Sequence, residues 1–76
     1  MQMTVRPSQA DVWIDQLFSA KAVAEGGVIR RNRNWVAREI GRDRFFREVE
    51  ARGFHLLETG EQLVVVCHTG KIHLHF

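Results

Sequence analysis

Residues 34–53 have the sequence NWVAREIGRDRFFREVEARG, whose apolar positions follow the period of an α-helix with one break. At about 100° per residue, the apolar residues before Gly41 and those after it point to different sides of a helix. The first group is Val36 and Ile40, and the second is Phe45, Phe46 and Val49. One straight helix would leave part of this set in water. We therefore predict two short helices, at about 34–40 and 42–52, with the second ended by Gly53.

After Gly53 the apolar residues recur at every second position, which is typical of β-strands. Three strands are predicted, FHLLE (54–58), EQLVVVCH (61–68) and KIHLHF (71–76). If Thr59-Gly60 and Thr69-Gly70 each form a two-residue hairpin turn, Leu56 lies opposite Leu63 and one face of the sheet is wholly apolar. That face consists of Phe54, Leu56, Leu63, Val65, Cys67, Ile72, Leu74 and Phe76. The helices must cover it.

A further helix is predicted upstream, near the start of the chain. Pro7 and Ser8 begin it, because Ser8 is a good N-cap and Asp11 three residues later fits a capping box. Its apolar stripe consists of Trp13, Ile14, Leu17 and Phe18. We expect this helix to run to about Ala20 or a few residues beyond, and to be followed by Gly26-Gly27.

Together these segments predict a single small α+β domain over residues 1–76. Its parts are an N-terminal helix, a short strand, a broken helix pair and a three-stranded antiparallel β-meander packed on the helices. The short strand would be Val28-Ile29, at an edge of the sheet. Residues 1–6 lack periodicity and are expected to be disordered. A chain this short buries only about 60 % of its unfolded surface, so dimerisation is an obvious further source of stability.

The composition excludes several classes of protein. Cys67 is the one cysteine, which rules out an intrachain disulfide, and no CxxC pair is present to hold zinc. The N-terminal sequence lacks the apolar segment of a signal peptide, and the longest apolar run, 63–67, is far too short to cross a membrane. We therefore expect a cytoplasmic protein with no membrane partner, no metal and no cofactor.

The positive charge is concentrated in one third of the chain. Residues 30–52 hold eight arginines against four carboxylates, a charge of +4, whereas the net charge of the whole chain is +2. Two acid-first pairs at i, i+4 spacing neutralise part of this charge. They are Asp43–Arg47 and Glu48–Arg52. Arg44 also belongs to the charge-balanced outward side of the second predicted helix, which leaves Arg30, Arg31, Arg33, Arg38 and Arg42. These five form a candidate binding site for RNA or DNA phosphate, or else a solvated surface.

The second face of the predicted sheet is neither wholly apolar nor wholly polar. Its candidate interface residues are His55, Leu57, Val64, Val66, His73 and His75. Val64 and Val66 make the middle strand apolar on both faces, which favours covering by a second copy of the chain. No metal site is expected, because the strand pair His73 and His75 supplies two ligands and zinc needs three or four.

Catalysis has little support in the sequence. Cys67 and His68 are adjacent on a strand, so they point to opposite faces and do not form a nucleophile–base pair. The stretch EGGVIRR lacks the spacing of a phosphate-binding loop. We therefore predict a non-enzymatic binding module for nucleic-acid phosphate, with a homodimeric protein-interaction domain as the alternative.

The predicted order of elements resembles that of a winged helix: helix, short strand, two helices and a strand hairpin. The residues AREIG, around Gly41, look like the turn of a helix-turn-helix, whose second helix enters the major groove of DNA. In this chain the outward residues of that helix carry a net charge of −1. They are Asp43, Arg44, Arg47, Glu48, Glu50 and Ala51. Phosphate contact without sequence reading is therefore the expectation.

Two further resemblances concern longer stretches. Residues 26–67 resemble a family of short uncharacterised bacterial proteins, through GGVIRR, REIGRDRF, RGFHLLETG and QLVVVC. Its members are sometimes labelled phosphoribosylanthranilate isomerase, a (β/α)₈ barrel that needs at least about 200 residues, so the label cannot describe this chain. The segment VEARGFHLLETGEQLVVV also resembles the HicA-type RNA-cleaving toxins. Their catalytic histidine follows a Gly-Ser pair, and TGEQLV has no histidine there, so the resemblance implies at most an RNA-contacting sheet.

Overall fold

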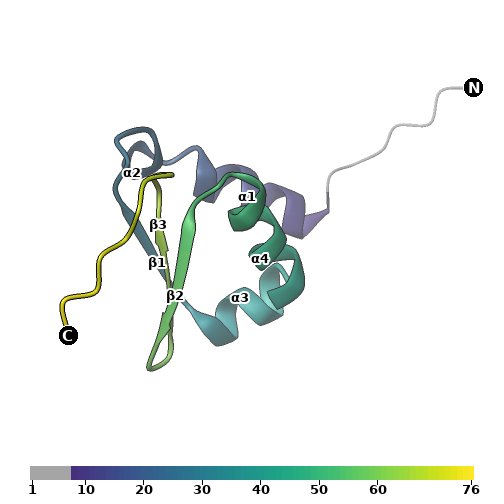
Figure 1. The fold of residues 1–76 in the computed structure, drawn as a ribbon. Coiled ribbons are helices and arrows are strands. Elements are labelled where there is room, and N and C mark those ends of the chain that lie inside the picture. Colours follow the sequence, from purple (N-terminus) through teal and green to yellow (C-terminus); the bar gives the residue numbers. More distant parts are fainter. Residues whose placement is uncertain (1–7) are drawn as a thin grey trace, which may run out of the picture.

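The computed structural model of the protein describes residues 8–76, and the disorder expected for residues 1–6 lies outside them. The helices are α1 (Gln9–Phe18), α2 (Lys21–Ala24), α3 (Arg33–Glu39) and α4 (Arg42–Ala51). The strands are β1 (Val28–Asn32), β2 (His55–Thr59) and β3 (Gln62–Val66). The strands form one antiparallel sheet, and α1, α3 and α4 lie on the same side of it (Figure 1). The predicted α+β class is confirmed.

The predicted capping box at the start of α1 is confirmed. The backbone N–H of Asp11 donates to Ser8 Oγ at 3.1 Å, and the backbone N–H of Ser8 donates to Asp11 Oδ2 at 2.9 Å. The helix ends earlier than expected, because Ala20 has an extended backbone. After it the chain forms the separate short helix α2, which the sequence did not predict.

The break between α3 and α4 lies at Gly41, as the periodicity predicted. Gly41 has a φ of 96°, a left-handed backbone conformation that favours glycine. The side chain of Asn32 caps α3 by accepting hydrogen bonds from the backbone N–H groups of residues 34 and 35, at 2.9 and 3.1 Å. Both apolar groups reach the core, since Val36 and Phe45 are fully buried.

The order of the sheet is β1-β3-β2, which corrects the predicted meander. Residues 71–76, predicted as the third strand, have no regular structure, and the hairpin at Thr69-Gly70 does not form. The physical reason is that β3 has only two edges. β1 pairs along one of them, from Val28 with Val66 to Asn32 with Gln62, and β2 takes the other. The short strand expected at Val28-Ile29 is therefore present as β1 and extends further, to Asn32. It pairs with the edge of β3 that the prediction assigned to residues 71–76.

The register of the β2–β3 hairpin also differs from the prediction. Thr59 pairs with Gln62, so the turn residues are Gly60 and Glu61 rather than Thr59 and Gly60. Leu56 consequently lies opposite Val65 instead of Leu63. A shift of two residues leaves every side chain on its predicted face. It also brings Glu58 opposite Leu63, at the end of the face that the sequence predicted to be wholly apolar.

The core lies between the helices and one face of the sheet. Its buried residues are Ile14, Leu17, Ile29, Val36, Ile40, Phe45, Val49, Leu63, Val65 and Cys67. Phe18 packs beside Phe45 and Phe54, with ring centroids 6.4 and 6.3 Å apart. No fully buried residue comes from β2. The helices therefore cover β2 less completely than they cover β1 and β3.

Candidate binding surfaces

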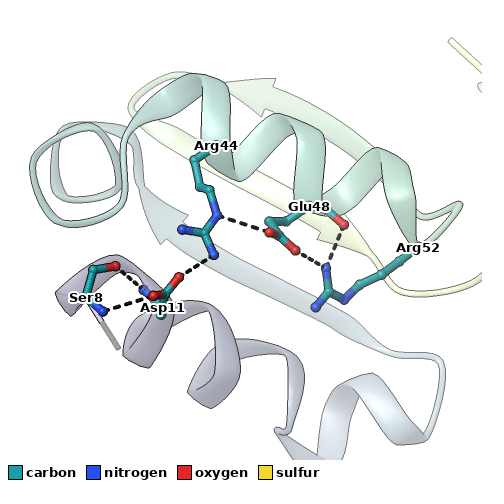
Figure 2. Close-up of polar contacts among 5 residues, drawn as sticks. All are labelled: Ser8, Asp11, Arg44, Glu48 and Arg52. Carbon is teal, nitrogen blue, oxygen red and sulfur yellow. Dashed lines mark hydrogen bonds and ion pairs between the residues drawn. The ribbon is translucent and has the colours of Figure 1, made fainter. Parts of the chain in front are cut away.

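Two arginines, Arg44 in α4 and Arg52 at its C-cap, are held by carboxylates within the domain (Figure 2). Arg44 contacts Asp11 of α1 through Nη2 at 2.8 Å and Glu48 through Nε at 3.1 Å. Arg52 contacts the other carboxylate oxygen of Glu48 at 2.9 Å, which confirms the predicted Glu48–Arg52 pair. The capping carboxylate of α1 thus also ties α1 to α4. Their side chains are 31 % exposed, less than those of Arg33 and Arg42, so they are less accessible to a ligand.

The same contacts shift the acidity of both carboxyl groups. The backbone N–H of Ser8, followed by the hydrogen bond from Arg44, lowers the pKa of Asp11. The hydrogen bonds from Arg52 and then Arg44 lower the pKa of Glu48. Both groups therefore stay charged to lower pH than an ordinary carboxyl group does.

Two of the five candidate phosphate-binding arginines converge on one carboxylate. Arg42, at the start of α4, contacts Glu58 Oε1 through Nη2 at 2.9 Å. Arg33, at the start of α3, approaches Glu58 Oε2 through Nη1 at 3.4 Å. The hydrogen bond from Arg42 is the main reason that the pKa of Glu58 is lowered, and Arg33 adds to it. The guanidinium of Arg42 also lies 4.5 Å from the ring centroid of Phe46.

Arg31 lies at the same end of the molecule. It pairs with Leu63, and Leu63 pairs with Glu58 on its other side, so Arg31 and Glu58 are two strand spacings apart, about 9–10 Å. Strand alternation places both side chains on the helix-facing side of the sheet. We call Arg31, Arg33, Arg42 and Glu58 the Glu58 cluster, which carries a net charge of +2.

The remaining two candidate arginines do not join this cluster. Arg30 pairs with Val64 and points to the opposite face of the sheet from Arg31. Arg38 is exposed on α3 and lies 3.5 Å from the carboxylate of its neighbour Glu39. Of the five predicted arginines, Arg33 and Arg42 therefore meet at Glu58. Arg31 lies across β3 from Glu58 and donates from Nη1 to the carbonyl oxygen of Arg30 at 2.6 Å.

The outer face of the sheet is the face that α1, α3 and α4 do not cover (Figure 1). Four predicted interface residues share it, because Leu57 pairs with Val64 and His55 pairs with Val66. β1 adds Val28 and Arg30 to the same face. Leu57 is 48 % exposed and Val28 is 47 % exposed. A pocket of about 530 Å³ on this face is lined by Arg30, Leu57, Glu58, Thr59, Gln62 and Val64.

His73 and His75 were predicted on a third strand of this face, and the absence of that strand corrects the prediction. They lie in the segment after β3 that has no strand partner. His55 instead lies beside His68, with ring centroids 5.7 Å apart, and its Nε2 bonds to the carbonyl oxygen of Gly70. These contacts hold the chain after β3 against the outer face at the start of β2.

A groove lies between α4 and the free edge of β2, and sequence reasoning missed it. Its volume is about 470 Å³. It is lined by Phe46, Val49, Glu50, Gly53, Phe54, His55, Leu56 and Glu58. No β3 residue contributes, because the groove is on the side of β2 away from β3. The predicted meander already left this edge of residues 54–58 free, but the groove beside it depends on how α4 packs, which local sequence patterns do not specify.

The described residues offer little for metal or nucleophilic chemistry. No group of three or more His, Cys, Asp or Glu residues that could hold a metal ion occurs among residues 8–76. Cys67 is buried, and burial raises the pKa of its thiol, which disfavours the reactive thiolate. Within the same residues, no helix has the length and apolar character needed to cross a membrane.

Comparisons of the chain with family models, with curated proteins and with solved structures each give no match. Function therefore has to be inferred from the geometry of the chain itself.

Proposed function

We propose that this chain is a small non-enzymatic module that binds the phosphate backbone of RNA or DNA through Arg31, Arg33 and Arg42. The observation that carries the proposal is the convergence of Arg33 from α3 and Arg42 from α4 on Glu58. Their side chains are 44 % and 51 % exposed, so both guanidinium groups reach solvent. Guanidinium groups match the geometry of phosphate oxygens.

The arrangement of the elements supports the proposal. Apart from the short α2, the chain order is helix, strand, two helices and hairpin, with β1 paired to β3, which resembles a winged helix. In a helix-turn-helix the pair of helices faces the nucleic acid. α3 and α4 are such a pair, joined at Gly41, and each begins with one of the two converging arginines.

The charges predict weak binding without sequence preference. Glu58 neutralises part of the charge of Arg33 and Arg42. The other exposed charged residues of α4 are Asp43, Arg47 and Glu50, whose charges nearly cancel, so α4 presents no strong set of contacts to base edges. Non-specific binding of this kind has dissociation constants of about 10⁻⁴–10⁻⁶ M at physiological salt.

Fluorescence anisotropy with random-sequence RNA and DNA, at increasing salt, tests the proposal. We expect binding at low salt, with the logarithm of the affinity falling linearly with the logarithm of the salt concentration. The double variant Arg33→Gln/Arg42→Gln should abolish most of it. The matched control Lys21→Gln/Arg38→Gln also removes two positive charges but leaves the Glu58 cluster intact, and should retain most of the binding. Equal losses in the two variants, or no binding at low salt, would contradict the proposal.

A protein-interaction module using the outer face of the sheet is the second candidate function. The half-exposed Val28 and Leu57, beside Val64 and Val66, favour it, because a soluble partner would remove this apolar surface from water. Leu57→Lys should then weaken association with the partner and leave binding to nucleic acid unchanged. If Leu57→Lys leaves every association of the protein unchanged, this second candidate fails.

A further inference from the structure

Residues 71–76 have the alternation of a strand but no strand partner within the chain. Ile72, Leu74 and Phe76 are apolar, and Lys71, His73 and His75 between them are polar. All three apolar side chains are exposed, Leu74 to 89 %. Since β1 and β2 occupy both edges of β3, this segment cannot pair with β3 of any folded copy.

The free edge of β2 offers unpaired backbone groups with which such a segment can form hydrogen bonds. In an antiparallel pair, about half of the backbone N–H and C=O groups of an edge strand point away from its neighbour, and on β2 they point away from β3. Beside this edge lies the groove whose apolar lining includes Phe46, Val49, Phe54 and Leu56. An extended peptide that pairs with such an edge also places alternate side chains into the adjacent groove.

The segment fits this edge in length and alternation. Residues 72–76 span about 13 Å when extended, the same as the five residues of β2. If Ile72, Leu74 and Phe76 face the groove, they meet its apolar side chains, and the polar residues between them face outward to solvent.

We propose that residues 71–76 of one copy add as a strand to the free β2 edge of a second copy, so that two copies exchange these segments. The segment leaves its own domain on the outer face, where Gly70 bonds to His55, and runs away from the helices (Figure 1). The groove lies on the helix side of β2, beside α4. In this exchange each copy pairs with the free β2 edge of the other, which gives a closed two-fold assembly.

Sedimentation of the purified chain over a wide concentration range, without nucleic acid, tests the exchange independently of the proposed function. We expect a dimer. Leu74→Lys should give a monomer, because it places a charge into the groove, and it should fold normally because Leu74 is exposed in a single copy. The matched control His75→Lys adds a charge on the outward side of the strand and should remain a dimer.

Amide hydrogen exchange on the same samples locates the added strand. We expect alternate amides within residues 72–75, those that point to β2, to be protected in the dimer and unprotected in Leu74→Lys. A monomer at all concentrations overturns the exchange, and so does a monomer in which residues 72–75 are protected, since the segment then pairs within its own chain. A dimer that survives Leu74→Lys and dissociates with Leu57→Lys also overturns it, because the outer face is then the interface.

Discussion

Replacing Glu58 by glutamine should strengthen binding to nucleic acid. Glu58 holds Arg42 at 2.9 Å and Arg33 at 3.4 Å, and the substitution keeps the length of the side chain while removing its charge. The Glu58 cluster then changes from a net charge of +2 to +3. One additional phosphate contact makes the slope of log affinity against log salt more negative by about 0.9 for duplex DNA and about 0.7 for single strands.

The slope sets the size of the effect that the assay must resolve. With an added slope of about 0.9, a fourfold rise in salt concentration lowers the DNA affinity of the variant by about 3.5-fold more than that of the original chain. Anisotropy titrations of one duplex at several salt concentrations measure this difference. Asp15→Asn is the matched control, because it removes the same charge from α1, where Asp15 is exposed and makes no ion pair within residues 8–76. Equal slopes for Glu58→Gln and Asp15→Asn would refute the reasoning, since only the net charge would then matter.

Three further predictions concern the stability and reactivity of the fold. Folding lowers the pKa of Asp11, Glu48 and Glu58, so the folded chain binds fewer protons than the unfolded chain in the acid range. The resulting stabilisation should be present at neutral pH and lost as the pH falls below about 4. Urea unfolding at several pH values measures this change in the free energy of unfolding. Gly41→Ala should lower the free energy of unfolding by about 1–3 kcal/mol, because a φ of 96° is unfavourable for alanine. An added Cβ meets no other atom there, so the cost comes from the backbone alone. An unchanged urea midpoint would contradict this. Cys67 should react with a thiol reagent slowly in the folded chain and rapidly in denaturant, and rapid reaction of the folded chain would show that it is not buried.

The helical part of the fold could be predicted because local patterns specify it. The capping box at Ser8, the break at Gly41 and the end near Gly53 are each marked by residues within one or two turns of the helix concerned. The end of α1 was predicted less well. Ala20 carries no residue-level signal for the extended backbone that separates α1 from α2.

The sheet shows the limit of periodicity. The pattern of 71–76 is as regular as that of β2, but alternation describes a strand without naming its partner. β1 has polar residues at Arg30, Arg31 and Asn32, so only its first two positions looked like a strand. The pairing of β1 with β3 is a long-range outcome, and it decides which segments remain outside the sheet.

The sequence predicted which residues belong to the candidate site but not how they are arranged in space. The sequence indicated which arginines lack a nearby acid, but the partners of Arg33 and Arg42 come from a strand 25 and 16 residues away. Local spacing also suggested an Asp43–Arg47 pair, which is not among the ion pairs between residues 8 and 76. Contacts between distant segments thus determine which arginines are accessible to phosphate.

Mapping of amide chemical shifts by NMR, during titration with a short random-sequence oligonucleotide, tests the proposed binding surface most directly. We expect salt-sensitive shifts concentrated at residues 31–34, at Arg42 and at Glu58. Shifts confined to the outer face, at Val28, Leu57 and Val66, or an absence of shifts at low salt, would contradict nucleic-acid binding through the Glu58 cluster.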